Sequence, residues 1–288
     1  MGLRQRLLGG GVDAAAEAAY PEALARRRRP GPSRDATLSF RLPLGLRMAR
    51  GLFRGLARWP LGWRLELVGA ERLPRDARGR VVGGWIGAGM PHVTWVEPFL
   101  IFMLLPPEPR LVWIGDGRAI YRSPLRRLLF ERLGGVIPIW PGGGPAAFAD
   151  HVALAGRVIE NGAVLVIFPE VGPPAAHGQA RPLSPGLMYL ALRTGAPLVP
   201  LVCGGTDDLF RGRRLRLEVL EPTTPAELAG LPAGPAPEPG TSAERSLARR
   251  SATALHDRTA AAVDAATKAV EPPAGARRSW PWLTHLLH

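Results

Sequence analysis

The chain has 288 residues, of which 46% are hydrophobic and 21% are charged, a balance that fits a folded protein and excludes collagen, a coiled coil and wholesale disorder. Lys and Arg number 37 against 24 Asp and Glu, which gives a formal net charge of +13. A surface this basic attracts nucleic acid, anionic lipid head groups or acidic carriers such as coenzyme A, although a generically basic protein has the same composition.

Cysteine content and hydropathy exclude two further classes. Cys203 is the only cysteine, so neither a disulfide framework nor a cysteine-based zinc site can form within one chain. The long uncharged stretch from Val81 to Val96 contains four glycines and a proline, and it is shorter than the ~20 apolar residues that a membrane-spanning helix needs. We therefore expect no transmembrane helix, and the N-terminus lacks the apolar stretch of a signal peptide.

Residues 1–37 are rich in Ala and Arg and are predicted to form a basic N-terminal tail. Residues 38–63 are predicted to contain an amphipathic helix, because arginines and apolar side chains recur at helical spacing on two separate stripes. The two stripes consist of Arg47, Arg50, Arg54 and Arg58, and of Met48, Leu52, Leu56 and Trp59. Such a helix suits a membrane interface, and an ordinary surface helix packed on the core is the alternative.

Residues 64–222 alternate between short apolar runs and helical patterns. The predicted strands cover 65–68, 80–86, 111–114, 136–139, 164–168, 198–202 and 215–220, and the predicted helices 98–105, 124–133, 145–160 and 186–194. This alternation predicts an α/β fold, with a mainly parallel sheet flanked by helices. Residues 223–288 are predicted to form a Pro- and Gly-rich linker, an Ala-rich helix and an aromatic tail.

A histidine and a glutamate lie five residues apart after the 80–86 strand. Pro98 favours a helix that begins near Glu97, which leaves His92 in the preceding loop. A carboxylate in that position can orient an imidazole and stabilise its charged form, so that His92 could remove a proton from a hydroxyl nucleophile. The alternative is a loop histidine beside a glutamate that caps a helix.

A second polar position follows the apolar 164–168 strand, which ends abruptly in Pro169-Glu170. Ligands of α/β sheets collect at the carboxyl ends of the strands, so Glu170 is expected in the same region as His92. Glu170 is a candidate for a structural or substrate-contacting anion rather than for a second catalyst.

Together these segments resemble the glycerophospholipid acyltransferase (PlsC-like) family. His92 to Glu97 resembles the family's His-x4-Asp motif, with Glu in place of Asp and with Thr94 where Ser is frequent. The segment Phe168-Pro169-Glu170-Val171-Gly172 resembles its Phe-Pro-Glu-Gly-Thr-Arg motif. Residues 121–125, 133–139 and 195–207 resemble further family regions in the same order, so the resemblance spans about residues 65–222.

The resemblance implies a peripheral membrane O-acyltransferase on the cytoplasmic face of the cell membrane. His92 would deprotonate an acceptor hydroxyl, Glu97 would orient His92, and the hydroxyl would attack the thioester of acyl-CoA or acyl carrier protein. The partners implied are the membrane surface, the acyl donor and a lipid acceptor, with no metal and no bound cofactor. The substrate-contacting residues would be Thr94, Arg118, Trp140, Phe168, Pro169, Glu170, Val171 and Gly172.

The sequence departs from the family where arginines grip a phosphate. Trp140-Pro141 stands where the second motif usually ends in Asp-Arg, and Pro173 stands where the third motif carries Arg. A phosphate dianion needs charged donors, so we expect an acceptor that lacks this phosphate, such as a glycolipid or a glycosylated isoprenoid. Trp140 would then stack on a sugar face, and a core tryptophan is the alternative.

Other functions remain alternatives at this point. A 1-acylglycerol-3-phosphate acyltransferase could use Arg118, Arg122 or Arg181 as substitute arginines, and a catalytically silent lipid-binding protein could keep the same fold. No nucleic-acid recognition motif is present, so nucleic-acid binding is not expected. A metallohydrolase is not expected either, because the six histidines include no helical pair backed by a glutamate.

Overall fold

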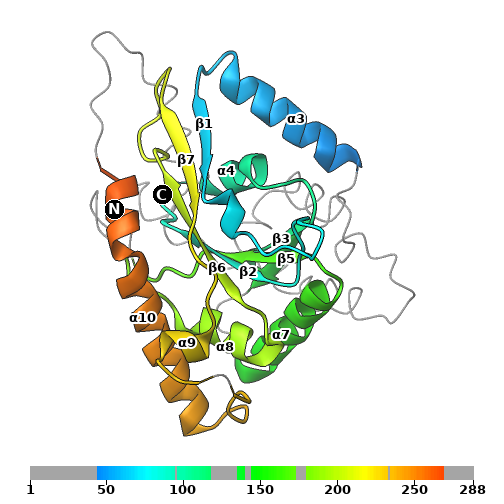
Figure 1. Cartoon of the computed structure of the whole chain (residues 1–288), viewed down its shortest axis with the longest axis vertical. Coiled ribbons are helices and arrows are strands. Elements are labelled where there is room, and N and C mark those ends of the chain that lie inside the picture. The colour runs from blue at the N-terminus through cyan, green and yellow to red at the C-terminus, as the bar shows by residue number, and fades with distance from the viewer. Residues whose placement is uncertain are drawn as a thin grey trace, which may run out of the picture.

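The structure, a computed structural model, describes residues 44–94, 96–117, 135–139, 144–172, 180–232 and 234–268. Seven strands form one sheet in the order β1-β7-β6-β2-β5-β3-β4, and every neighbouring pair is parallel except β6 and β7. The predicted α/β fold with a mainly parallel sheet flanked by helices is therefore confirmed (Figure 1). The strands are β1 (Arg64–Val68), β2 (Ile86–Met90), β3 (Leu111–Asp116), β4 (Val136–Ile139), β5 (Val164–Ile167), β6 (Leu198–Gly204) and β7 (Arg214–Val219).

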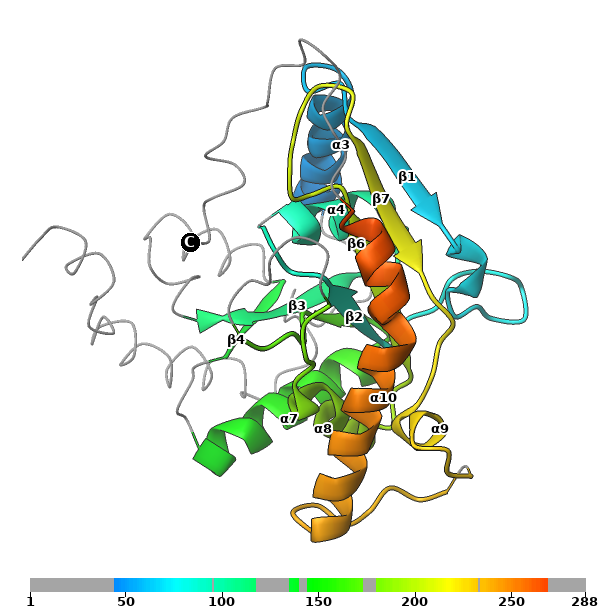
Figure 2. The same ribbon diagram turned by 90° about the vertical axis from the view of Figure 1, so that its left-hand side faces the viewer.

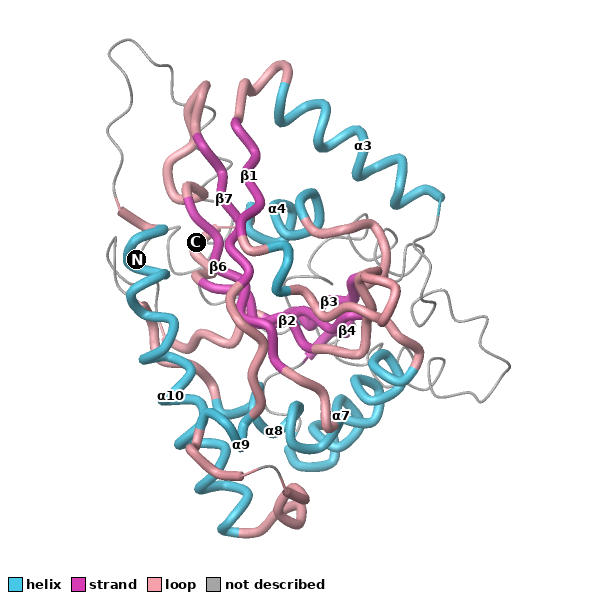
Figure 3. The backbone as a smooth tube through the Cα atoms, viewed as in Figure 1, coloured by secondary structure: helices cyan, strands magenta, loops and turns pink. Residues whose placement is uncertain are grey.

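Helices cover both faces of the sheet, which explains why its central strands are apolar on both sides (Figures 2 and 3). On one face the core joins the sheet to α7, α8 and α10, and on the other it joins the sheet to α3 and α4. The helices are α3 (Leu44–Arg58), η1 (Ala70–Arg72), α4 (Val96–Leu104), α7 (Gly144–Glu160), α8 (Pro185–Thr194), α9 (Pro225–Leu228) and α10 (Ser242–Ala266). Of the described helices, none is both long and apolar enough to cross a membrane.

One strand lies further along the chain than the sequence indicates. The apolar run 80–86 is not the strand, because residues 76–79 turn and Val81 pairs only with Arg75 in an isolated bridge. The strand β2 is Ile86–Met90 instead. Its glycines, which normally weaken a strand, are required because neighbours approach closely: a Cβ on Gly89 would lie 2.6 Å from the ring of Phe168.

The amphipathic helix predicted within residues 38–63 is present as α3, at the outside of the molecule (Figure 1). Its apolar stripe faces away from the core, with Leu44, Met48 and Leu52 each more than 60% exposed and Trp59 just beyond the helix 89% exposed. The arginine stripe is divided, because Arg50 is buried against α4 whereas Arg47 and Arg58 are exposed. The tail at 1–37 and the predicted helix at 124–133 lie outside the described residues.

Candidate active site

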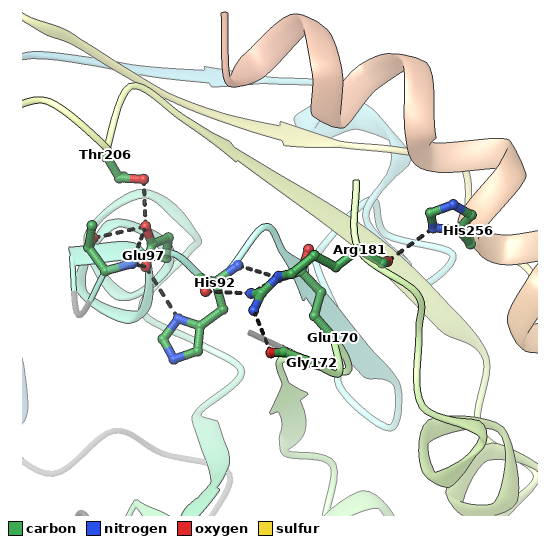
Figure 4. A network of polar contacts seen from close by, with 8 residues as sticks. His92, Glu97, Glu170, Gly172, Arg181, Thr206 and His256 are labelled. Atoms are coloured by element: carbon green, nitrogen blue, oxygen red, sulfur yellow. Dashed lines mark hydrogen bonds and ion pairs between the residues drawn. The ribbon is translucent and has the colours of Figure 1, made fainter. Parts of the chain in front are cut away.

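His92 and Glu97 face each other at the carboxyl end of β2. His92 lies in the loop that follows the strand, and Glu97 lies in the first turn of α4. The distance from His92 Nδ1 to Glu97 Oε2 is 3.2 Å (Figure 4). The Glu97 side chain is fully buried and the His92 side chain is 33% exposed. In the tautomer with its proton on Nδ1, the ring donates to Glu97, and Nε2 is left as the basic nitrogen of this partly exposed imidazole.

Two threonines hold the buried Glu97 carboxylate by further hydrogen bonds. Thr206 Oγ1 and Thr94 Oγ1 donate to Oε1 at 2.6 and 2.8 Å, and the Thr94 backbone N–H donates to Oε2 at 2.9 Å. The contact from the Thr94 N–H to the glutamate three residues later is half of a capping box. Glu97 therefore both caps the start of α4 and contacts the histidine.

The His92 ring lies on an aromatic support. It stacks on Phe168 with the ring centroids 4.2 Å apart and the planes 22° apart. Trp113 lies beyond, 6.2 Å from Phe168 and nearly parallel to it. The absence of a side chain on Gly89 makes room for Phe168, so β2 and β5 together fix the plane of the imidazole.

A buried ion pair holds the backbone of His92 on both sides. Glu170 accepts the His92 N–H at 2.6 Å, and Arg181 donates to the His92 carbonyl at 2.6 Å. Arg181 also contacts Glu170 directly and donates to the Gly172 carbonyl at 3.4 Å. The Glu170 side chain is 2% exposed and that of Arg181 is 12% exposed. His256 on α10 donates from Nδ1 to the Arg181 carbonyl at 3.0 Å, which connects this cluster to α10 (Figure 4).

The polar residues of the site follow three adjacent strands of the sheet. In the order β6-β2-β5, Thr206 follows β6, His92 follows β2 and Glu170 follows β5. The loop that carries Thr206 is braced by Arg213, which donates to the Gly205 carbonyl and to Asp207, each at 3.1 Å. The segment after β5 is braced by backbone bonds to residues 182–184. The site thus lies at the carboxyl ends of three central strands, where ligands of parallel sheets collect.

The structure places most of the predicted substrate-contacting residues close to His92 and Glu97. The contacts that it shows for them are with other protein groups. Thr94 binds Glu97, Phe168 supports the imidazole and Glu170 binds the His92 backbone. Pro169 and Val171 make backbone contacts to residues 184 and 182, and Gly172 accepts from Arg181. The predicted substrate contacts Arg118 and Trp140 lie outside the described residues.

Sequence reasoning missed Thr206 as a site residue and considered Arg181 only as a phosphate ligand. Thr206 could have been found from its position directly after an apolar strand, the same signal that points to Glu170. Arg181 gives no such signal, because it precedes α8 and reaches Glu170 only through the pairing of 169–171 with 182–184. Its guanidinium is already bound to protein groups, so it is not a free cation for a phosphate.

Two other kinds of chemistry, metal binding and a reactive thiol, can be compared with the described residues around this site. Within the described ranges, no group of three or more His, Cys, Asp or Glu is placed to hold a metal. Burial raises the pKa of the Cys203 thiol well above its usual value, and the nearby carboxylates of Glu97 and Glu170 raise it further. This thiol therefore stays protonated at neutral pH, and His92 is the group suited to accept a proton.

The described residues form a mainly parallel α/β domain with a histidine–carboxylate pair at its strand ends. Within it, residues 67–204 match the family model described as Acyltransferase. The chain is also 30% identical over 131 residues to the 1-acyl-sn-glycerol-3-phosphate acyltransferase of Cocos nucifera, an alignment that covers 44% of this chain and 39% of the coconut protein. The chain therefore resembles the acyltransferase family over residues 67–204, and it spans about two fifths of the length of this curated relative.

A solved structure agrees with the fold. The crystal structure of the 1-acyl-sn-glycerophosphate acyltransferase PlsC from Thermotoga maritima superposes with a TM-score of 0.51 and covers 87% of this chain and 93% of its own. The sequence identity is 16%, so this likeness concerns the fold alone.

Proposed function

We propose that this protein transfers an acyl group from a thioester donor to a hydroxyl of a lipid acceptor. The observation that carries the proposal is the contact between His92 Nδ1 and the fully buried Glu97, which leaves Nε2 as the proton acceptor. A positioned imidazole of this kind contributes roughly 10²- to 10⁴-fold to a rate. The family match over residues 67–204 supports the same reaction.

In the proposed reaction, His92 Nε2 takes the proton of the acceptor hydroxyl as its oxygen attacks the thioester carbonyl carbon. A tetrahedral intermediate forms, and Glu97 stabilises the positive charge that develops on the imidazole. The carbon–sulfur bond then breaks, and the imidazolium returns its proton to the departing thiolate. The products are an ester and a free thiol, and no metal or bound cofactor takes part.

The donor is proposed to be acyl-CoA or acyl carrier protein, and the acceptor a lipid at the cytoplasmic face of the cell membrane. The support for a peripheral membrane position is α3, where an exposed apolar stripe lies beside Arg47, Arg54 and Arg58. The net charge of +13 adds attraction to anionic head groups.

The acceptor is proposed to lack the phosphate of a lysophosphatidate, as a glycolipid or a glycosylated isoprenoid does. The support is that Arg181, one of three arginines that could replace the missing motif arginine, binds Glu170 and the backbone of His92 and Gly172 instead. The name of the coconut relative favours the alternative, a 1-acylglycerol-3-phosphate acyltransferase. A catalytically silent lipid-binding protein is the other alternative.

The test is mass spectrometry of the products formed by purified protein. Mixed long-chain acyl-CoAs or acylated carrier protein are supplied with either lysophosphatidate or a pool of glycosylated lipids, and His92→Ala serves as the control. A product of the glycosylated pool that needs His92 supports the whole proposal. An equal or greater yield from lysophosphatidate overturns the acceptor assignment and keeps the reaction. No His92-dependent product from any combination overturns the proposed activity.

A further inference from the structure

Helix α3 is attached to α4 by the side opposite its exposed stripe. Arg50, 7% exposed, donates through Nη2 to the Met103 carbonyl at 3.0 Å and also contacts the Leu105 carbonyl. Nearer the other end of α4, Phe53 packs edge-on against Phe99 with the ring centroids 5.0 Å apart. One helix therefore contacts α4 at two points while its outer face stays uncovered by the described residues.

The Arg50 contacts satisfy the carboxyl end of α4. The last carbonyls of a helix have no partner within the helix, and the helix dipole places partial negative charge there. A buried guanidinium supplies both the missing donors and the opposite charge. Burial, together with the neighbouring Arg54, lowers the pKa of Arg50 to about 10, so the side chain is still charged at neutral pH.

The same helix α4 begins with Glu97, the partner of His92. It has nine residues, about 13 Å at 1.5 Å per residue, and such a short helix moves as one rod. A shift at Met103 or Phe99 is therefore passed on to Glu97. The structure thus connects the outer stripe of α3, through Arg50 and Phe53, to the carboxylate that orients the histidine.

We propose that Arg50 is a positioning residue that couples α3 to α4, so that docking of α3 on an anionic lipid surface holds Glu97 in place against His92. This inference rests on the proposed function. It adds that the lipid surface sets the geometry of the pair as well as supplying the acceptor. A misplacement of about 1 Å at a catalytic group can cost roughly 100-fold in rate, so a small movement of α4 is enough.

The experiment compares Arg50→Met with Arg58→Met, a matched loss of one arginine from the exposed side of α3. Vesicles of phosphatidylcholine and phosphatidylglycerol are the probe. Three quantities are measured: vesicle binding by co-sedimentation, kcat and KM with vesicle-borne acceptor, and amide hydrogen exchange of residues 96–104 with and without vesicles.

We expect Arg50→Met to bind vesicles within about twofold of wild type and to keep its KM, while kcat falls roughly tenfold. Vesicles should slow exchange in α4 of the wild type and of Arg58→Met, and should fail to do so in Arg50→Met. Arg50→Lys, which keeps the charge but not the fork of donors, should recover part of kcat. If Arg50→Met does not fold, the same readouts on Arg50→Lys decide.

Two results would overturn the coupling. In the first, vesicles bind the wild type without changing exchange in α4. In the second, Arg50→Met loses vesicle binding while its kcat at saturating vesicles equals that of wild type, which makes Arg50 a lipid contact only. The exchange measurement does not depend on turnover, so a wild type that binds vesicles, protects α4 and transfers no acyl group would refute the proposed function alone.

Discussion

At the scale of single residues, Glu97 stands where the motif that this segment resembles has an aspartate, which is shorter by one methylene. The helix begins at Val96, one residue before Glu97, and the Thr94 N–H, Thr94 hydroxyl and Thr206 hydroxyl surround the carboxylate. These donors are spaced for the longer side chain, which reaches His92 Nδ1 at 3.2 Å. The extra methylene of glutamate is therefore needed for the carboxylate to reach His92 and these donors together.

This geometry predicts that Glu97→Asp lowers the proposed activity, although it introduces the residue found in the motif that this segment resembles. Shortening the side chain by one methylene withdraws the carboxylate from His92 and from Thr206, and kcat should fall roughly 10- to 100-fold. Glu97→Gln, which keeps the length and loses the charge, should also be impaired. Steady-state acyl transfer measures the effect, and a Glu97→Asp variant as active as wild type would contradict this account.

A second prediction concerns the ion pair behind His92. Arg181→Met leaves the Glu170 carboxylate buried without its cation, so the free energy of unfolding should fall by about 3 kcal/mol. Adding Glu170→Gln removes the orphaned charge and keeps an acceptor for the His92 N–H, so the double variant should recover part of the loss. Urea denaturation measures both variants.

The control for this pair is Arg249→Met, at an exposed position of α10, which should change stability by no more than about 0.5 kcal/mol. A double variant less stable than Arg181→Met would show that the carboxylate is held by groups other than Arg181.

At the scale of elements, α8 and α10 are joined by a partly buried ion pair. Arg193 on α8 donates to Glu244 on α10 through Nε at 2.7 Å and Nη2 at 2.9 Å, and Thr241 caps the start of α10 by accepting the Glu244 N–H. The hydrogen bonds from Arg193 lower the pKa of Glu244 below its usual value, and the Gly240 N–H adds to this effect.

The sign of this shift predicts a pH dependence. The folded protein binds a proton at Glu244 more weakly than the unfolded chain does, so the pair stabilises the fold above the unfolded pKa of about 4.3. That contribution is lost as the pH falls through the lower pKa of the folded state. The difference in thermal midpoint between wild type and Glu244→Gln should therefore shrink between about pH 6 and pH 3. A constant difference, or an equal effect of the exposed Glu238→Gln, would refute it.

Several elements follow from sequence because local signals agree with the fold. The runs 136–139, 164–168 and 198–202 are apolar and bounded by Gly or Pro, and each lies on a strand of the sheet. The strand β2 cannot be predicted in this way, because glycine is a weak strand former. Gly87 and Gly89 make room for Leu201 and Phe168, which lie far away in sequence. Periodicity finds α3 but cannot reveal that Arg50 turns inward, because the partner carbonyls belong to α4.

At the scale of the whole molecule, the sheet order assembles the site. His92, Glu170 and Thr206 lie far apart in sequence and meet because β6, β2 and β5 are neighbours. The sequence predicts that such residues lie at strand ends, but not which strands are adjacent, so the contacts of Thr206 with Glu97 and of Arg181 with Glu170 appear only in three dimensions.

The outer stripe of α3 predicts how the whole molecule meets a lipid surface. Burial of one large apolar side chain contributes about 1.5–3 kcal/mol, so Met48→Asp with Leu52→Asp should weaken binding to anionic vesicles by roughly 100-fold or more. Leu231→Asp, at an exposed leucine beyond α9, is the matched control and should bind as wild type does.

Added salt should weaken wild-type binding in part, because salt screens the charge of the arginines but does not weaken the burial of apolar side chains. Co-sedimentation measures all three proteins. Undiminished binding by the double variant would refute docking through α3, and a wild-type dimer that the double variant dissociates would assign the stripe to contact between two copies of the chain.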